Sequence, residues 1–385
     1  MLKSLVTFAM LGGSAAAACA QDAGTRGITT YGVLDAGRVG ERGCTNGCAT
    51  RVGSGVASAS RIGIQGSEAV GQNTTAIFGF ETELRLDSGR AANNHETART
   101  LDQEQGRNPG RNPGSDLARE RLEHQAWVGL SGELGAITIG RQYNLEYLAL
   151  ADVADPFKGG TAGSATNLIG GPRRTDNTVQ YYKTLPNGFS AGASWAARDL
   201  DTSPAGRAWG MTVGLNSGPL TVRAAHRNQG AVKAQLNYKT SNDMTSKNSL
   251  LAANLRLGWG TAYAAYSMSR GISNSPLFNP DNPYAAGLAR TPSNSSRDVL
   301  FGMAVPVDRS FTLLASYIRK DDRDLANQDA NQAAFGASYA LSRRTDFYAA
   351  YSHIRNRNGA GYTVGNASAP GSGNKAFNIG MRHAF

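Results

Sequence analysis

Long apolar runs, cysteines and clustered histidines are all scarce in this chain. After Gln21 no stretch approaches the ~20 consecutive apolar residues that a membrane helix requires, which excludes helical membrane spans. The five histidines are scattered without the spacing of metal ligands, and neither a G-x-S-x-G nor an H-E-x-x-H motif is present. Nothing in the sequence supports an enzyme, a metal site or a cofactor, and we expect none of them.

Cysteine is limited to three residues, one of them in the N-terminal segment. Cys44 and Cys48 form a C-x-x-x-C pair in a loop with glycine and asparagine. In an exported protein this pattern predicts a small disulfide loop. The alternative, a metal site, would need two further ligands nearby.

The segment MLKSLVTFAMLGGSAAAACA has an early lysine, an apolar run and a small-residue ending. This pattern predicts a Sec-type signal peptide, residues 1–20, cleaved before Gln21. The remaining residues, 21–385, are predicted to form one domain. The alternative is a lipoprotein signal acylated at Cys19, but Ala16 stands where a large aliphatic residue is expected.

Positive charge exceeds negative charge, with 39 basic and 29 acidic residues and a formal net charge of +10. Such an excess favours an anionic partner. Basic residues interleave with acidic ones, and no basic cluster accompanies a recognisable nucleic-acid-binding module. We therefore do not expect nucleic acid to be that partner.

Segments with alternating apolar side chains recur from Gly27 onward, separated in turn by short polar turns and longer polar loops. In TAIFGFETELRL the apolar side chains fall on one face of an extended strand and the charged ones on the other. The chain ends on the same alternation, NKAFNIGMRHAF. The even number of segments puts both termini on the short-turn side. The sixteen predicted strands are 27–39, 57–67, 74–86, 121–131, 134–143, 177–185, 189–198, 206–216, 219–228, 248–257, 261–270, 297–307, 310–320, 331–341, 346–355 and 374–385.

Strands with one apolar face fit either a soluble sandwich, whose apolar faces pack together, or a membrane barrel, whose apolar faces contact lipid. The apolar face here is nearly free of charge, as expected where a lipid-facing Arg or Lys would cost about 2–4 kcal/mol. Open strand edges are excluded in lipid, so the sheet must close. We predict an all-β fold, a sixteen-stranded antiparallel transmembrane β-barrel around a water-filled lumen. The charged residues expected on the lumen face are Arg61, Glu81, Glu83, Arg85, Glu123, Arg223, Arg256 and Arg382.

Several fragments occur in a specific order along the chain: TTYGVLDAG, SRIGIQGSE, QAWVGLSGELGAITIGRQYN, DNTVQYYKT and the final GMRHAF. Together they resemble the Gram-negative general porins, specifically the beta-proteobacterial branch. The resemblance implies a homotrimer of sixteen-stranded barrels in the outer membrane, each with its third long loop folded inward to narrow the pore. It also implies that the terminal Phe385 belongs to the signal read by the barrel-assembly machinery.

By position, the resemblance assigns residues 143–176 to the inward constriction loop. Family members often carry an acid beside a Pro-Phe-Gly-Gly-like turn there. This chain reads DPFKGG from 155 to 160, which keeps one carboxylate and adds a cation. The charged loop residues are then Glu146, Asp152, Asp155 and Lys158. The expected arginine cluster on the facing wall is Arg61, Arg141, Arg173 and Arg174.

Arg141 is a point of conflict within these expectations. Alternation counted from Ile137 and Ile139 turns its side chain to the outer face. A β-bulge or a bend at the strand end would have to re-aim it into the pore. Without such a feature, Arg141 does not belong to the cluster.

The predicted function is passive diffusion of small hydrophilic solutes and ions across the outer membrane, with a modest preference for anions over cations. At a narrowed point, fixed charges lie within the ~8 Å Debye length of a passing ion, where each charge pair is worth about 1–4 kcal/mol. The expected cations outnumber the expected acids there. One alternative is a substrate-specific channel for phosphate or small organic anions. Another is that the arginines are only solvated surface or contacts to lipopolysaccharide.

Overall fold

The computed structural model describes residues 27–43, 48, 50–87, 89–91, 124–169, 173–197, 207–230, 245–271, 293–364 and 373–385. The predicted signal peptide and Glu123 lie outside these residues. Cys48 is disulfide-bonded, and its predicted partner, Cys44, also lies outside them. The prediction of the Cys44–Cys48 pair therefore stays a prediction.

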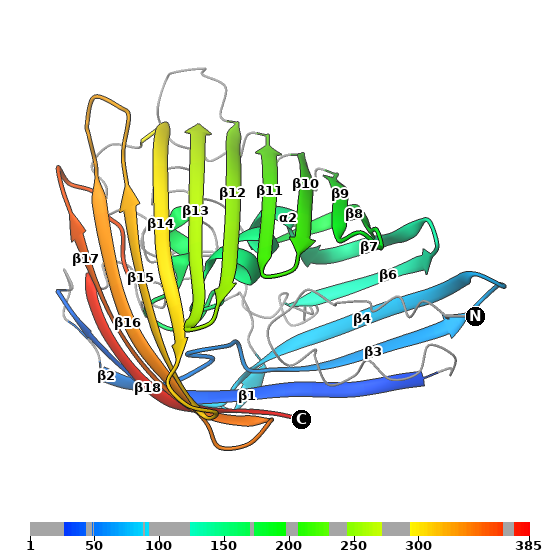
Figure 1. Cartoon of the computed structure of the whole chain (residues 1–385), viewed down its shortest axis with the longest axis horizontal. Helices are drawn as coiled ribbons and strands as arrows, with labels where there is room; N and C mark the ends of the chain where they lie inside the picture. The colour runs from blue at the N-terminus through cyan, green and yellow to red at the C-terminus, as the bar shows by residue number, and fades with distance from the viewer. Residues whose placement is uncertain are drawn as a thin grey trace, which may run out of the picture.

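The described chain is built almost entirely of antiparallel strands (Figure 1). Their bounds are β1 Gly27–Arg42, β2 Thr50–Ser54, β3 Arg61–Ala69, β4 Thr74–Arg85, β5 Arg90–Ala91, β6 Gln125–Gly132, β7 Gly135–Tyr143, β8 Arg174–Thr184, β9 Phe189–Ala196, β10 Ala208–Ser217, β11 Leu220–Gln229, β12 Ser246–Leu257, β13 Gly260–Gly271, β14 Ser295–Pro306, β15 Phe311–Lys320, β16 Ala330–Ala340, β17 Thr345–Asn356 and β18 Lys375–Ala384.

The sheet closes into a barrel because its first and last strands pair. Strand β1 pairs with β18 from Val33↔Ala384 to Arg42↔Lys375, and Figure 1 shows β1 in blue beside β18 in red. The backbones of Gly32 and Phe385 extend this pairing by two reciprocal hydrogen bonds of 3.1 Å. Both described ends lie at the short-turn end of the barrel, as predicted.

Sixteen strand positions make up the described wall, in agreement with the prediction. Strands β2 and β3 share one position, because β1 pairs with β2 along one part of its length and with β3 along another. Strand β5 is two residues long and pairs only with β4. The ends of the predicted strands lie within three residues of the observed ends, except in the second and fourth.

The second predicted strand, 57–67, is wrong as a continuous strand. Strand β2 ends at Ser54 and β3 begins at Arg61. The intervening residues, 55–60, leave the wall on the lumen side, where Val56 is buried against Val39 and Tyr348. We call residues 55–60 the strand break. The fourth strand begins four residues later than predicted, at Gln125.

Alternation sorts side chains to the two faces of the wall as predicted. In β10, Trp209, Met211, Val213 and Leu215 are 40–50% exposed and Thr212 is only 4% exposed. The same contrast recurs along the other strands, with the large exposed hydrophobic side chains on the outer face. The outer face therefore suits lipid rather than a protein core.

The third long connection spans residues 144–173, and we call it the inward loop; its described part, 144–169, runs inside the ring of strands. It contains the helix α2 (Leu145–Ala149), the π-helical turn η3 (Leu150–Ala154) and the 3₁₀ turn η4 (Ala165–Leu168). In Figure 1, α2 lies within the ring. Among the described residues, no helix is both long enough and apolar enough to cross a membrane.

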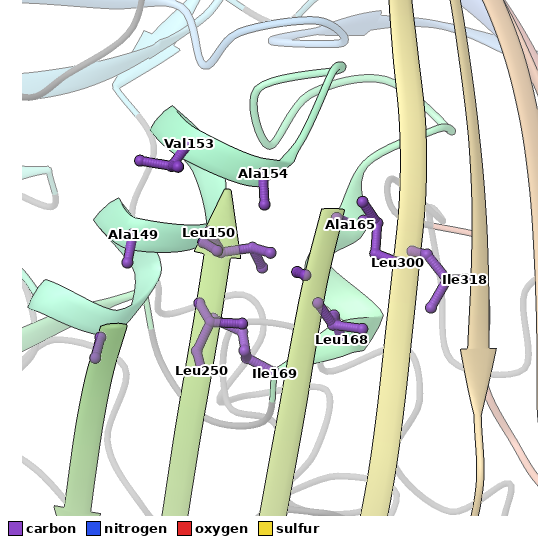
Figure 2. Close-up of a cluster of buried hydrophobic side chains, with 13 residues drawn as sticks. Ala149, Leu150, Val153, Ala154, Ala165, Leu168, Ile169, Leu250, Leu300 and Ile318 are labelled. Atoms are coloured by element: carbon purple, nitrogen blue, oxygen red, sulfur yellow. The ribbon is translucent and has the colours of Figure 1, made fainter. Parts of the chain in front are cut away.

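The largest buried apolar cluster lies between the inward loop and the inner wall (Figure 2). Leu150 and Leu168 of the loop pack there with Leu250, Leu300 and Ile318 of β12, β14 and β15. Each of these five side chains is at most 3% exposed. The apolar core of this molecule therefore attaches the loop to one side of the barrel and leaves the other side of the lumen open to charged groups.

Candidate functional site

The base of the inward loop is closed at Asn144. The N–H of Asn144 donates to the carbonyl oxygen of Arg173 at 3.0 Å, which joins the two ends of the loop. The side-chain oxygen of Asn144 accepts from the N–H of Tyr147 at 2.8 Å and caps α2. Asn144 therefore fixes where the chain leaves the wall and where the helix begins.

Asp155 organises the turn at the tip of the loop. Its carboxylate accepts three backbone hydrogen bonds, from Phe157 at 2.9 Å, Gly159 at 2.8 Å and Ala165 at 2.9 Å. Burial raises the pKa of Asp155 to about 6, although these donors oppose the rise. This acid is therefore used to shape the loop.

Three residues at the tip lie in the left-handed backbone region: Lys158 with φ +51°, Gly159 with φ +75° and Thr161 with φ +56°. Non-glycine residues in this region carry a conformational cost and persist only where their surroundings hold them. The side chain of Lys158 is nevertheless exposed. The turn thus presents a cation to the lumen on a constrained backbone.

Hydrogen bonds fasten the loop to strands distant in sequence. The N–H of Ala162 donates to Oδ1 of Asn378 at 2.6 Å. The amide of Asn167 donates to Oε1 of Gln332 at 3.0 Å and to the carbonyl oxygen of Thr363 at 2.7 Å. The loop is therefore tied to β16, to β18 and to the chain that follows β17.

Phe157 adds an apolar contact at the tip. It packs in a buried cluster with Ala334 and Ala350. A Cβ on Gly336 would lie 2.7 Å from the Phe157 ring, so the ring occupies space that only glycine leaves free. The Pro-Phe part of the predicted turn therefore docks against the wall.

The four predicted loop charges separate into two groups by exposure. Glu146 and Asp155 are only 1% and 2% exposed. Asp152 and Lys158 are exposed to the lumen. Glu146 and Asp155 are therefore buried within the docked loop, whereas Asp152 and Lys158 face the water-filled lumen.

Glu146 faces the inner wall from α2. Burial raises its pKa to about 7, and the nearby Arg227 and Asn248 oppose the rise. Arg227 and Asn248 are directly paired on β11 and β12. The carboxyl group therefore lies over a polar pair of the wall at the point where α2 docks.

Asp152 and Lys158 have arginines of the wall as neighbours. Desolvation by the surrounding protein raises the pKa of Asp152 to about 6, and the positive charges of Arg223 and Lys158 oppose that rise. Burial within the barrel also lowers the pKa of Lys158, and the guanidinium of Arg382 lowers it further. Arg382 itself pairs with Asp346 at 2.9 Å. These side chains therefore form one group of charges near the loop tip, with three cations (Lys158, Arg223, Arg382) and two acids (Asp152, Asp346).

A second group of charges lies on the wall near the base of the loop. Arg61 pairs with Glu81 at 3.4 Å, and Glu81 also accepts from the hydroxyl of Tyr31 at 2.8 Å. His124 lies between two carboxylates, 3.3 Å from Glu81 and 3.4 Å from Glu83. This cluster brings together three predicted lumen residues with two that the sequence analysis missed.

Arg174 joins this cluster from the end of the inward loop. Its guanidinium lies 3.1 Å from Nε2 of His124 and donates to the hydroxyl of Tyr143 at 3.0 Å. It also lies over the Tyr143 ring at 4.7 Å. Arg173 instead lies over the ring of Tyr147 at 5.5 Å. The adjacent arginines therefore separate, one to the wall cluster and one to α2.

The other predicted lumen residues occupy different depths. Arg223 is 8% exposed on β11. Arg85 ends β4. Arg256 is exposed at the short-turn rim, where it donates to the carbonyl oxygen of Gly218 at 2.7 Å. Arg256 is therefore remote from the inward loop.

Arg141 lies on the outer face, so its expected place in the pore is corrected. It pairs directly with Ala126, which pairs with the outward Phe80. A register shift does occur between Gly140 and Gln142, but on the side of β8. The guanidinium of Arg141 pairs with Asp176 at 2.5 Å, so the bulge leaves it outward.

Tyr31 and His124 had no signal in local spacing. They meet their partner Glu81 across 50 and 43 positions of sequence. Tyr31 lies between Thr30 and Gly32 in β1, and His124 directly precedes β6. The pairing of β1 with β3, of β3 with β4 and of β4 with β6 brings Tyr31 and His124 to the side chain of Glu81.

No group of three or more potential metal ligands occurs among the residues that the structure describes. What this arrangement offers is a passage bordered by fixed charges, one side formed by a fastened loop and the other by the wall. Such a site can sort ions by charge and limit solutes by size.

Comparison with known proteins identifies relatives along the whole chain. A family model described as Gram-negative porin matches residues 6–359. Outer membrane porin protein 32 of Delftia acidovorans is 25% identical over 407 residues, covering all of both chains. An outer membrane porin protein of Bordetella pertussis is 25% identical over 435 residues, again covering all of both.

Solved structures share the fold. An anion-selective porin from Comamonas acidovorans superposes with a TM-score of 0.71 at 19% identity, covering 94% of this chain and 100% of that one. Salmonella typhi OmpF gives a TM-score of 0.64 at 15% identity, with 93% and 97% covered. The trimer form of Vibrio cholerae OmpT gives 0.61 at 14% identity, with 94% and 100% covered.

Proposed function

Because this chain belongs to the Gram-negative porin family, we propose that it is a general diffusion pore of the outer membrane with a modest preference for anions. Small hydrophilic solutes and ions pass through the water-filled barrel. The inward loop limits their size, and the charges that border the loop set the preference. Both the family to which the chain belongs and the barrel fold that it adopts are those of channel proteins.

The observation that carries the anion preference is the exposure of Lys158 at the loop tip beside Arg382 of the wall. Arg223 faces the same passage near Asp152. The two acids there are Asp152 and Asp346, and Asp346 is already engaged with Arg382. The balance of charge along the passage is therefore positive.

The expected size of this preference is modest. A unit charge about 4 Å from a passing ion is worth about 1 kcal/mol at the dielectric constant of water and about 4 kcal/mol at a surface-like value of 20. Salt screens this interaction with a Debye length of ~8 Å. One uncompensated cation therefore favours anions over cations several-fold, without excluding cations.

The relatives support the proposal. The Comamonas acidovorans neighbour, which shares the fold, is described as an anion-selective porin. At this low sequence identity the comparison supports only a shared barrel fold. The proposed charge preference of this chain is therefore argued from its own lumen residues.

Reversal potentials in a salt gradient across planar bilayers test the proposal. The wild-type protein is expected to show anion preference, and Lys158→Gln is expected to lower it. Arg256→Gln is the matched control: it also removes a cation from the lumen face, but at the short-turn rim, so a smaller effect is expected. Cation selectivity of the wild type would refute the charge assignment, and a protein without channel activity would refute the pore itself.

Assembly and targeting follow from the same proposal. The chain is exported through Sec, loses residues 1–20, and is inserted by the barrel-assembly machinery with Phe385 as part of the signal. It functions as a homotrimer, as supported by the trimer form of a neighbour that shares its fold. Crosslinking in native outer membranes, followed by sizing, tests the trimer.

Lipopolysaccharide is a proposed partner of the outer face. Exposed basic side chains occupy the outer face at the long-loop ends of β12 to β17, directly beyond exposed aromatic and apolar side chains. Two of them, Lys247 and Arg270, are directly paired. Like charges placed opposite each other on a sheet are destabilising, so a bound anion would stabilise this pair. Phosphate groups of the outer leaflet would supply that anion. The set is Lys247, Arg270, Arg297, Arg319 and Arg355.

A further inference from the structure

The strand break occupies a gap in the pairing of β1. Ala36 pairs with Ser54 and Val33 pairs with Arg61. Between these pairs the second strand position contains the six residues 55–60, whereas β1 contains only two. The surplus chain cannot remain in the wall, and Val56 is buried on the lumen side. One of the two β1 residues opposite the break is Asp35.

The carboxylate of Asp35 holds the strand break in place. It accepts hydrogen bonds from the N–H groups of Val56 at 3.0 Å, Ala57 at 3.1 Å and Ser58 at 2.9 Å. The hydroxyl of Tyr348 on β17 donates to the same carboxylate at 2.7 Å. Asp35 is fully buried, so this carboxylate is committed to these four donors rather than to solvent.

The strand break in turn holds the tip of the inward loop. The carbonyl oxygen of Val56 accepts from the N–H of Thr161 at 2.8 Å. A Cβ on Gly160 would lie 1.7 Å from the carbonyl oxygen of Ala57, so the two backbones are in direct contact there. Lys158 is two residues away from that contact.

We propose that Asp35 is a positioning residue of the pore: through the strand break it fixes the loop tip and with it the place of the Lys158 cation in the passage. The carboxylate gathers three N–H groups that would otherwise lack a common acceptor. Without it the strand break loosens, the loop tip loses its seat at Thr161, and Lys158 moves out of the passage. This inference rests on the proposed function.

Charge and position predict opposite results for Asp35→Asn. If the carboxylate acted only as a negative charge near the lumen, its removal would increase the anion preference. If it positions the tip, the preference falls toward that of Lys158→Gln, while single-channel conductance and current noise rise. Asp346→Asn is the matched control, because it removes a lumen carboxylate whose ion pair is with Arg382 of the wall. We expect that control to increase the anion preference.

Two further variants keep the test decisive if Asp35→Asn assembles poorly. Tyr348→Phe removes one donor to Asp35 and changes no charge, so a smaller change in the same direction is expected. Gly160→Ala disturbs the same contact from the loop side and should reproduce the phenotype of Asp35→Asn. Combining Gly160→Ala with Asp35→Asn should add little to either change alone, since both act through one contact.

Reversal potential and conductance are measured for all variants in the same bilayers. An increase in anion preference for Asp35→Asn that matches Asp346→Asn would overturn the positioning role, as would additive effects of Asp35→Asn and Gly160→Ala. A conducting wild type without charge preference would contradict the proposed selectivity, and the conductance changes alone would then decide the positioning role. The two failures are therefore distinguishable.

Discussion

The backbone N–H of Ala162 donates to the side-chain oxygen of Asn378 at 2.6 Å, although 216 positions separate the two residues. The donor belongs to the inward loop and the acceptor to the last strand. The loop can reach this arrangement only after the barrel has closed, because β18 completes the wall. This attachment of the loop to the wall therefore needs the last strand in place.

Replacing Asn378 with alanine should loosen the loop. The N–H of Ala162 would lose its acceptor in a buried place, which costs about 1–3 kcal/mol of docking free energy. We expect larger and noisier single-channel currents. Asn331→Ala is the control, since it removes a hydrogen bond with Tyr317 on the outer face and nothing from the loop. Equal currents for both variants would contradict a role for Asn378 in holding the loop.

Asp152→Asn should increase the anion preference. Asp152 is exposed on the loop near Arg223 and Lys158, so its removal leaves those cations less compensated. A change of about 1 kcal/mol, or several-fold in the anion-to-cation permeability ratio, is expected. The reversal potential in a salt gradient measures it. A shift toward cations would show that Asp152 does not face the passage.

Docking of α2 should weaken as pH rises. Burial raises the pKa of Glu146 from 4.5 to about 7, so the docked state holds the proton more tightly than a solvated carboxylate does. Docking is then strongest below about pH 4.5 and weakens as pH rises through about 7. Asp155, with its pKa raised to about 6, contributes in the same direction.

Single-channel current noise between about pH 5 and about pH 8 checks this dependence. We expect the noise of the wild type to increase over that range. Glu146→Gln should remove the upper part of the increase and leave the part that Asp155 contributes. A wild-type trace with constant noise would refute the assignment of Glu146 as a pH-dependent contact.

Gly336→Val should displace Phe157 from the wall. The added side chain would occupy the space of the ring, since a Cβ there lies 2.7 Å from it. Overpacking of this kind costs about 1–3 kcal/mol, and the loop tip should move into the passage. Reduced uptake of small sugars in a liposome-swelling assay is the measurement. Gly258→Val is the control, since nothing lies within 4 Å of its added Cβ.

Arg141→Gln should leave the charge preference unchanged. The side chain lies on the outer face and pairs with Asp176, so it does not face the ions in the lumen. A loss of about 0–1 kcal/mol of stability is expected for a partly exposed pair. The reversal potential measures the preference, and a fall comparable with that of Lys158→Gln would return Arg141 to the pore.

Alternation predicted the wall well because lipid outside and water inside impose opposite demands on successive side chains. It failed at residues 57–60, which were predicted to begin the second strand. The stretch GVASAS has small residues that a strand accepts on either face, so nothing local marks a break. The strand break instead makes its hydrogen bonds with Asp35 and Thr161, which are distant in sequence.

The site was only partly predictable for a related reason. Loop charges could be named from the sequence, but their division into buried supports and exposed charges depends on which wall residues meet them. Alternation was right about Arg141, whereas the position suggested by resemblance was not. Alternation predicts directly which face of the sheet a side chain occupies. An assignment by position in the family does not show which neighbouring strand a β-bulge affects, and here the bulge lies between β7 and β8.

The reciprocal hydrogen bonds between Gly32 and Phe385 make the junction of the two chain ends equivalent to any other seam between neighbouring strands. In a closed sheet of this kind, the position at which the chain starts is not distinguished by the strand pairing. Joining Phe385 to the start of β1 through a short linker, and cutting the chain in one of the long connections, should yield a circular permutant that refolds in detergent to the same barrel, although it would lack Phe385 as a terminal assembly signal. The order in which strands are synthesised would change, and the finished pore would not.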